Sequence, residues 1–379
     1  MSQWICGWDI GGAHLKVALR DPAGRWTQVQ QLPCPLWRGI EHLAMALQEA
    51  VHGWPVAPHH VAHAATMTGE LVDAFANRAA GVVAILDCCE AAFAGAVWRW
   101  FGIDGRMHGR DITRSDPLRF ASANWLASAD CAAQRASGLF IDIGSTTTDI
   151  VRLDQGVAQP RGFTDGERLS AGELVYRGVV RTPLMAVADA IDWRGAVRPL
   201  MAEHFATSAD IFRLTGDLDE SADVWPAADG GEKTPAASAR RIARLIGEDV
   251  EAAPLDEWCR VAEQLAGAMS ETILAAATQV FGASLVRPSL VQQRGQPAEP
   301  PPGARGAALA WASVAPQRVV CAGVGHWFAA RIAGRLGLPA VDFGALVGAA
   351  DVLGAREHAP ALAVAELAAA ASAEHHSAG

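Results

Sequence analysis

Two stretches of the sequence, far apart in the chain, combine a carboxylate with a tight turn between two apolar runs. The clearer stretch is 140–151, in which Asp142 precedes the turn and Asp149 follows it. The turn consists of small and hydroxylated residues: Gly144, Ser145, Thr146 and Thr147. A backbone that turns this tightly exposes several N–H donors, and the hydroxyl groups add more. The stretch therefore predicts an anion-binding site.

The N-terminal stretch has the same design. Asp9 lies at the end of an apolar run, and Gly11 and Gly12 form the turn. Lys16 lies on the apolar run that returns from it. Two carboxylates would repel a phosphate group unless a cation lay between them, so the two turns predict Mg²⁺ as well as phosphate. We expect Asp9 and Asp142 to hold the metal, with the turns and Lys16 binding phosphate.

The alternative explanation for either stretch alone is a hairpin whose Asp only caps a turn. Composition gives independent support to the site. The chain has 31 Lys and Arg residues, of which only Lys16 and Lys233 are lysine. Where arginine fills nearly every basic position, the remaining lysines are candidates for sites that need a compact ammonium group.

Two further Gly-rich turns are candidate ligand sites. Asp229 and Lys233 flank one of them, and a solvated turn is the alternative interpretation. Gly323 and Gly325 end an apolar run and precede a predicted helix. Glycines at such a position allow a flat ligand to approach the backbone closely, so ATP or an acceptor substrate could bind there.

A reaction at the paired turns would need a general base, and three carboxylates could serve: Asp149, Asp165 and Glu167. Other roles are open for two of them, because Asp149 could orient its turn and Glu167 could form an ordinary ion pair with Arg168. His14 lies inside the first turn and could donate to a phosphate, although a turn position alone also explains it.

Other residues that could hold a metal have simpler explanations. His59, His60 and His63 lie close together in the sequence, but the first two are consecutive and would point apart on a strand, so we interpret them as a solvated loop. The chain has seven cysteines and no CxxC pair, which predicts neither a disulfide framework nor a zinc site. Cys88 and Cys89 are interpreted as core residues near a strand end.

The composition is that of a folded globular protein. Hydrophobic residues make up 51% of the 379 residues and charged residues 19%, and a chain of this length usually forms two domains. A net charge of −10 argues against a nucleic-acid partner, which would require a basic face. No apolar run has the length of a membrane span, so we expect a cytoplasmic protein without a membrane partner, with oligomer formation left open.

The order of predicted elements occurs twice. Residues 1–136 are predicted to form a first lobe, to which a helix within 345–357 returns. Residues 137–344 are predicted to form a second lobe with an inserted helical and loop region. The Ala-rich segment 358–379 is interrupted by Glu366, so we expect a flexible tail with at most a frayed surface helix.

Hydrophobic periodicity and turn residues predict the individual elements. They indicate helices over 39–51, 69–77, 205–214, 240–246 and 257–281, strands over 61–67 and 82–86, and an exposed loop over 288–306. Residues 164–169 and 181–184 are interpreted as loops beside a site.

The three glycine-containing turns, in this order, resemble those of the acetate/sugar kinase–Hsp70–actin superfamily. Within it, the chain resembles the hydantoinase/oxoprolinase-related branch, and more narrowly the family linked to tetrahydromethanopterin-dependent one-carbon transfer. The resemblance is carried by the segments 7–16, 66–71, 123–127, 142–149, 164–169, 172–183 and 206–214. It implies an α/β fold of two duplicated ribonuclease-H-like lobes around a central cleft.

The resemblance also implies a reaction. Similar enzymes of methanofuran synthesis join the phenol oxygen of γ-glutamyltyramine to a furanmethanol diphosphate and release pyrophosphate with the help of Mg²⁺. Relatives in methylotrophs are expected to serve methylofuran, the formyl carrier of formaldehyde oxidation. The implied partners are therefore a small-molecule diphosphate and a phenolic amine.

Two other classes of function remain open. The first is an ATP-dependent kinase or ATPase, or a hydantoinase-like hydrolase, with ATP as a possible but less favoured cofactor. Release of ADP in the presence of a small alcohol acceptor would select it. The second is a non-enzymatic regulator that senses a ligand.

Overall fold

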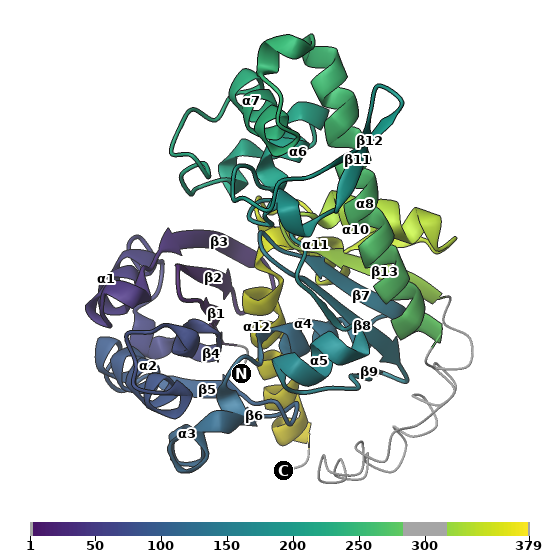
Figure 1. Cartoon of the computed structure of the whole chain (residues 1–379). Coiled ribbons are helices and arrows are strands. Elements are labelled where there is room, and N and C mark those ends of the chain that lie inside the picture. Colours follow the sequence, from purple (N-terminus) through teal and green to yellow (C-terminus); the bar gives the residue numbers. More distant parts are fainter. Residues whose placement is uncertain (1–2, 283–316, 378–379) are drawn as a thin grey trace.

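The computed structural model describes residues 3–282 and 317–377, and the loop predicted over 288–306 lies outside them. Two mixed sheets with their helices form two lobes, and a region made mainly of helices is inserted into the second (Figure 1). In Figure 1 the first lobe carries the purple and blue elements on the left, and the inserted region rises above the second lobe.

The first sheet has the order β3-β2-β1-β4-β5-β6. Its strands are β1 (Ile5–Ile10), β2 (His14–Arg20), β3 (Trp26–Pro33), β4 (Ala62–Met67), β5 (Val97–Phe101) and β6 (Met107–His108). Cys6, Trp8 and Ile10 of β1 face one core, which the helices α1 (Glu41–Ala50) and α2 (Arg78–Ala92) cover. Ile5 faces a second core on the opposite side. Because β1 is buried on both faces, its sequence is apolar apart from Gly7 and Asp9.

The second sheet repeats this arrangement, with the order β10-β8-β7-β13-β14. Its strands are β7 (Ser137–Ile143), β8 (Thr148–Asp154), β9 (Val157–Ala158), β10 (Leu174–Val175), β13 (Gln317–Ala322) and β14 (Ala340–Asp342). In each lobe the first strand, β1 or β7, pairs antiparallel with the next strand and parallel with a later one. The prediction of two duplicated α/β lobes is confirmed, and Asp9 and Asp142 lie at equivalent positions.

The inserted region contains the hairpin of β11 (Ala190–Trp193) and β12 (Ala196–Pro199), which was not predicted, and three helices that were. The remaining helices of the described chain are α3 (Arg110–Ser115), α4 (Asn124–Ala133), α5 (Asp165–Ala171), α6 (Ser208–Thr215), α7 (Pro235–Leu245), α8 (Leu255–Gly282), α10 (His326–Arg335), α11 (Phe343–Leu346) and α12 (Ala359–Ser377). The inserted helices are α6, α7 and α8. Across the described ranges, every helix is too short or too polar to cross a bilayer.

The predictions for residues 69–92 are wrong. Residues 82–86 lie inside α2 and form no strand, and 69–77 form only a short 3₁₀ turn followed by irregular chain. The side chain of Asn77 accepts a hydrogen bond from the amide of Ala80 at 2.9 Å and so begins α2. The apolar run 82–86 is too short for its hydrophobic periodicity to distinguish a buried helix from a strand. Cys88 and Cys89 therefore belong to a helix.

The prediction of a flexible tail after residue 358 is also wrong. Helix α12 lies between the two lobes, against β1, β2, β4 and α4, and most of its first residues have no exposed surface (Figure 1). A helix that is apolar all round belongs in the interior, which explains its Ala-rich sequence. Glu366 is paired with Arg20 at 3.2 Å and with Arg135 at 2.5 Å, so its charge does not mark a free surface. Helix α12 therefore returns to the first lobe, and the 3₁₀ turn Ala355–His358 that precedes it also contacts β2 and β3.

The contact between α12 and β1 depends on a glycine. A Cβ atom at Gly7 would overlap the backbone oxygen of Ala361. We expect Gly7→Ala to lower the free energy of unfolding by about 3 kcal/mol, because the helix and the sheet would have to separate. The matched control is Gly267→Ala in α8, where a Cβ meets no neighbour and helix propensity favours alanine. Urea unfolding of both variants measures the difference, and equal stabilities would contradict this account of the packing.

His63 belongs to a buried aromatic cluster in the first lobe. Its Nδ1 accepts a hydrogen bond from the Trp8 indole N–H at 3.0 Å, and its ring stacks on Trp98 at 4.5 Å. The interpretation of the three histidines as a solvated loop is wrong for His63, which is buried in β4. His59 and His60 do not point apart, because a 3₁₀ turn holds their rings 4.1 Å apart. Burial lowers the pKa of His63 to about 4. The neutral ring is therefore part of the folded state.

This predicts that His63 makes the protein less stable as the pH falls below 6.5. Between pH 6.5 and 4 the unfolded chain binds a proton at His63 that the folded chain does not, so stability falls as the pH falls. The loss for this one residue is on the order of 3 kcal/mol. Urea unfolding at pH 7 and pH 4.5 should show a smaller difference for His63→Gln than for the wild type. Parallel losses would rule out His63 as the cause.

Candidate functional site

The two acidic turns come together at the ends of β1 and β7. Asp9 lies opposite Lys16 in the β1–β2 pair, with 3.8 Å between the Asp9 Oδ2 and Lys16 Nζ atoms. Asp142 lies opposite Asp149 in the β7–β8 pair. Burial and the charge of Asp149 raise the pKa of Asp142 to about 7; Asp9 also raises it, and Lys16 lowers it. Asp9 and Lys16 therefore both lie close enough to act electrostatically on Asp142.

The Asp9 carboxylate is the strongest candidate for a metal ligand. It is 4% exposed, and its Oδ1 atom is buried with no hydrogen-bond partner. Burial raises its pKa, while the charge of Lys16 and a hydrogen bond from Asn124 favour the ionised form. In residues 3–282 and 317–377, no three His, Cys, Asp or Glu side chains converge on one point. The buried and unpaired Oδ1 atom of Asp9 is the kind of oxygen ligand that Mg²⁺ takes, because Mg²⁺ commonly binds one or two carboxylates and completes its shell with water and phosphate oxygens.

The same hydrogen bond closes both turns. The amide of Gly11 donates to the His14 carbonyl at 2.9 Å, and the amide of Gly144 donates to the Thr147 carbonyl at 2.8 Å. These two amides are therefore used within the turns. Phosphate would have to bind to the N–H and hydroxyl groups at the tips, which include those of Ser145 and Thr146.

A segment after β10 supports the second turn. Val179 N–H donates to the Gly144 carbonyl at 3.1 Å, and Arg181 N–H donates to the Ser145 carbonyl at 2.8 Å. A Cβ atom at Gly178 would overlap the backbone between Ser145 and Thr146, so only glycine permits this approach. The segment fixes the turn and carries the Arg181 side chain to its edge.

The structure separates the three candidate bases. Asp149 accepts a hydrogen bond from Arg168 at 2.7 Å and lies next to Asp142. Glu167 accepts hydrogen bonds from the Phe163 and Thr164 amides at the start of α5, which lower its pKa and make it a weak base. Asp165 is exposed in the first turn of the same helix. Asp149 is the candidate base that lies with the paired turns.

Gly323 and Gly325 serve close packing. Gly323 has a φ of 83°, and a Cβ atom there would overlap the Asp142 carboxylate and the Ile143 carbonyl. At Gly325 a Cβ atom would meet the side chain of Ile143 at 2.6 Å. The two glycines let α10 approach the end of β7, and Gly323 lies at the edge of the acidic site.

Asp229 and Lys233 lie in the inserted region and are held by ion pairs. Asp229 accepts from the buried Arg241 at 2.8 Å, and the Lys233 Nζ atom lies 3.2 Å from Asp223 Oδ1. Their charges are therefore already compensated within the protein. Neither residue belongs to the two turns that carry Asp9 and Asp142.

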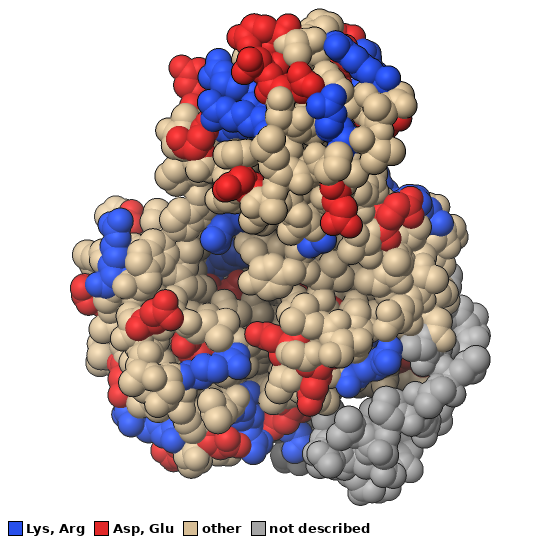
Figure 2. Space-filling view, viewed as in Figure 1, with Lys and Arg blue, Asp and Glu red and all other residues tan. Residues whose placement is uncertain are grey.

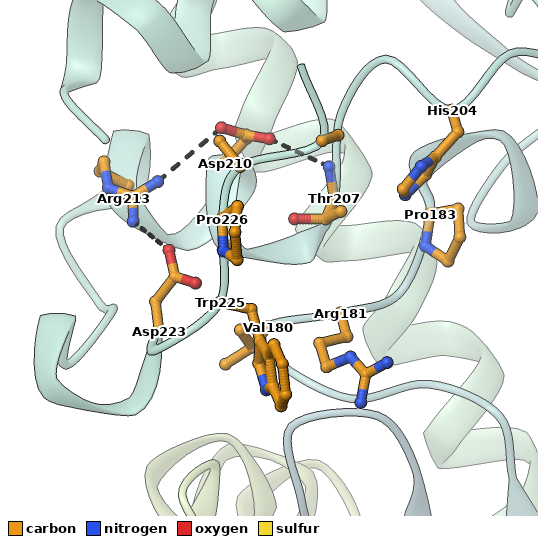
Figure 3. Close-up of a pocket in the computed structure, with 13 residues that line it drawn as sticks. Val180, Arg181, Pro183, His204, Thr207, Asp210, Arg213, Asp223, Trp225 and Pro226 are labelled. Carbon is orange, nitrogen blue, oxygen red and sulfur yellow. Dashed lines mark hydrogen bonds and ion pairs between the residues drawn. The ribbon is translucent and has the colours of Figure 1, made fainter. Parts of the chain in front are cut away.

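A pocket of about 430 Å³ lies between the second lobe and the inserted region (Figure 3). It is lined by Val180, Arg181, Pro183, His204, Thr207, Ala209, Asp210, Arg213, Asp223, Trp225, Pro226, Ala227 and Ala228. The backbone of Arg181 is hydrogen-bonded to the second turn, so the pocket adjoins that turn. Figure 2 shows the molecule hollowed between the lobes, with basic and acidic atoms within the hollow.

Our sequence analysis missed several residues of this region. Trp225 lies 6.3 Å from the His14 ring and 5.5 Å from the Trp37 ring, measured between centroids, so it connects the inserted region with the first lobe. Asn124, which contacts Asp9, lies in the segment 123–127, and the resemblance to the family was the only signal there. Arg181 likewise lies in a segment, 172–183, that resembles the family. No periodicity or motif pointed to Trp225.

The duplicated sheets and the paired turns have the arrangement of an acetate/sugar kinase–Hsp70–actin-like fold. Residues 62–369 match the hydantoinase/oxoprolinase family, and the chain belongs to that family. It is 30% identical over 276 residues to (4-{4-[2-(gamma-L-glutamylamino)ethyl]phenoxymethyl}furan-2-yl)methanamine synthase of Methanocaldococcus jannaschii, covering 72% of this chain and 80% of the relative. The protein of the same name from Methanococcus vannielii is 32% identical over 124 residues, which are 33% of this chain and 55% of that protein.

A solved structure supports the fold. Nucleotide-free acetone carboxylase aligns with 96% of this chain and 70% of its own, with a TM-score of 0.54 and 10% sequence identity. Similarity at this level of identity concerns the fold alone.

Proposed function

We propose that this protein is a transferase of methanofuran-type carrier synthesis that forms an aryl ether. The donor is a furanmethanol diphosphate and the acceptor is the phenol of a γ-glutamyltyramine-type amine. The observation that supports the proposal is the meeting of Asp9, Lys16 and Asp142 at the two acidic turns. The product named for the relative from Methanocaldococcus jannaschii contains the ether bond that this reaction would form.

The reaction breaks one C–O bond and forms another. The bond between the furan methylene carbon and the diphosphate oxygen breaks, and pyrophosphate leaves with the electron pair. The phenol oxygen forms the new bond to the same carbon and loses its proton. An electron-rich furan ring stabilises positive charge on the methylene carbon, so the largest task of the protein is to stabilise the leaving pyrophosphate.

The residues of the paired turns fit this task. The tips of the turns at Gly12 and at Ser145 to Thr147 would donate hydrogen bonds to the phosphate oxygens, and Lys16 would neutralise part of their charge. Mg²⁺ would be held by Asp9 and Asp142 and would supply Lewis-acid stabilisation of the leaving group. Asp149 would take the phenolic proton, directly or through water.

The direct test is an assay of the purified protein with an aminomethyl-furanmethanol diphosphate, γ-glutamyltyramine and Mg²⁺. We expect the ether product by mass spectrometry, with one pyrophosphate released for each ether formed. A parallel reaction contains ATP and small alcohol acceptors instead. Formation of ADP there, without ether in the first reaction, would replace the proposal with the kinase alternative. Release of pyrophosphate without consumption of the acceptor would indicate a hydrolase.

A further inference from the structure

The pocket beside the second turn has no role in the reaction as described above. Its walls differ in charge. Arg213 donates to Asp223 at 2.6 Å and to Glu220 at 2.8 Å, and Arg241 donates to Asp210 at 2.7 Å. These ion pairs neutralise the charges of one wall.

The opposite wall consists of Trp225, Val180 and Arg181, which lie side by side along the lower edge of the pocket in Figure 3. The guanidinium carbon of Arg181 lies 5.6 Å from the Trp225 ring centroid. Among the described residues, no carboxylate lies within ion-pair distance of Arg181. Arg181 is thus a cation of the pocket wall that an aromatic ring supports and no acid compensates.

The aromatic surface continues across to the first lobe. Trp225 contacts Trp37, whose side chain is 42% exposed, and His14 in the first turn. The charge of Arg181 helps to lower the pKa of His14, after the larger effects of burial and of Lys16. The aromatic surface therefore lies between the pocket and the anion-binding turns.

We propose that this wall binds the acceptor, with the phenol ring on Trp225 and Trp37 and the phenol oxygen at the Arg181 guanidinium. The inference rests on the proposed transferase function. An aromatic ring that carries a developing negative charge matches a wall made of indole rings and one uncompensated cation. The remainder of the acceptor extends into the pocket. Arg181 favours the phenolate and so assists the loss of the phenolic proton.

The first test measures binding of γ-glutamyltyramine by calorimetry, without donor or metal. We expect Arg181→Gln and Trp225→Ala each to weaken binding about 10- to 100-fold, and Trp225→Phe to restore most of it. The control is Arg331→Gln, which disrupts an Arg–Trp stack on α10, 4.7 Å from the Trp327 centroid and outside the pocket. Unchanged acceptor binding in both pocket variants would overturn the inference. Weaker pyrophosphate binding in Arg181→Gln alone would make Arg181 a phosphate ligand instead.

The second test separates stabilisation of the phenolate from simple packing. Ring-fluorinated acceptors have more acidic phenols and depend less on the cation. We expect the rate deficit of Arg181→Gln to shrink by about 10-fold with a difluorinated acceptor, whereas the deficit of Trp225→Ala stays constant. Equal deficits with all acceptors would contradict the role of Arg181. A wild-type protein that neither binds nor consumes the acceptor would overturn the proposed function itself, together with this inference.

Discussion

Asp142→Asn should reduce the rate of ether formation by at least about 10³-fold while leaving the protein folded. Asparagine keeps the size of the side chain and removes the charge that Mg²⁺ requires. Asp142 is also the carboxyl group on which Asp9, Asp149 and Lys16 all act. Removing its charge relieves repulsion in the unliganded protein, so stability should be unchanged or higher. This combination of lost activity and kept stability identifies a residue selected for function.

The measurement is the initial rate of pyrophosphate release at saturating Mg²⁺, beside a thermal unfolding curve of the same sample. Asp154→Asn is the matched control, because Asp154 lies at the far end of the same hairpin, away from the turn. We expect its activity to stay within about 2-fold of the wild type, as for a surface substitution. An active Asp142→Asn protein would reject our assignment of the metal ligands.

Arg168→Ala should lower the free energy of unfolding by about 4 kcal/mol. The guanidinium is 2% exposed, donates to Asp149 at 2.7 Å and lies 3.8 Å above the Trp125 ring. It also donates to the Glu173 carbonyl at 3.1 Å. Removing it leaves a cavity and an unpaired carboxylate next to Asp142. Arg168→Lys should recover only part of the loss, because an ammonium group cannot make the same forked contacts.

Arg152→Ala is the control for this prediction. Arg152 lies on the same strand as Asp149 and contacts Phe281, with 4.9 Å to the ring centroid, but it has no ion pair with an acid in the described ranges. We expect a loss of about 1 kcal/mol or less from urea unfolding. Equal losses in the two variants would mean that the pair with Asp149 adds nothing to stability.

Residue types and local order were enough to predict the duplicated lobes and the two turns. Each turn is a local structure, closed by a hydrogen bond between residues three apart, so its glycine and its carboxylate are visible in a short window. The equivalence of Asp9 and Asp142 followed from the same design occurring twice. The three helices of the inserted region were predicted for the same reason, because their apolar spacing is local.

The features that the sequence analysis missed depend on long-range packing. Helix α12 was interpreted as a tail because Glu366 interrupts its Ala-rich sequence, whereas both lobes bury the helix. Trp225 gains its role only when the inserted region brings it to Trp37 and His14. Contacts between distant segments decide these roles, and no local pattern encodes them. Glu167 differs, because the capping box of α5 that engages its carboxylate is a local pattern, Thr164 followed three residues later by Glu167.

The central claim is that the two acidic turns bind one metal ion and one diphosphate together. Crystals of the protein with pyrophosphate and Mn²⁺ in place of Mg²⁺ test it directly, because Mn²⁺ gives an anomalous signal. We predict one anomalous peak between the carboxylates of Asp9 and Asp142, with pyrophosphate density at the turn formed by residues 144–147. A peak at a different site, or pyrophosphate bound away from both turns, would contradict the account.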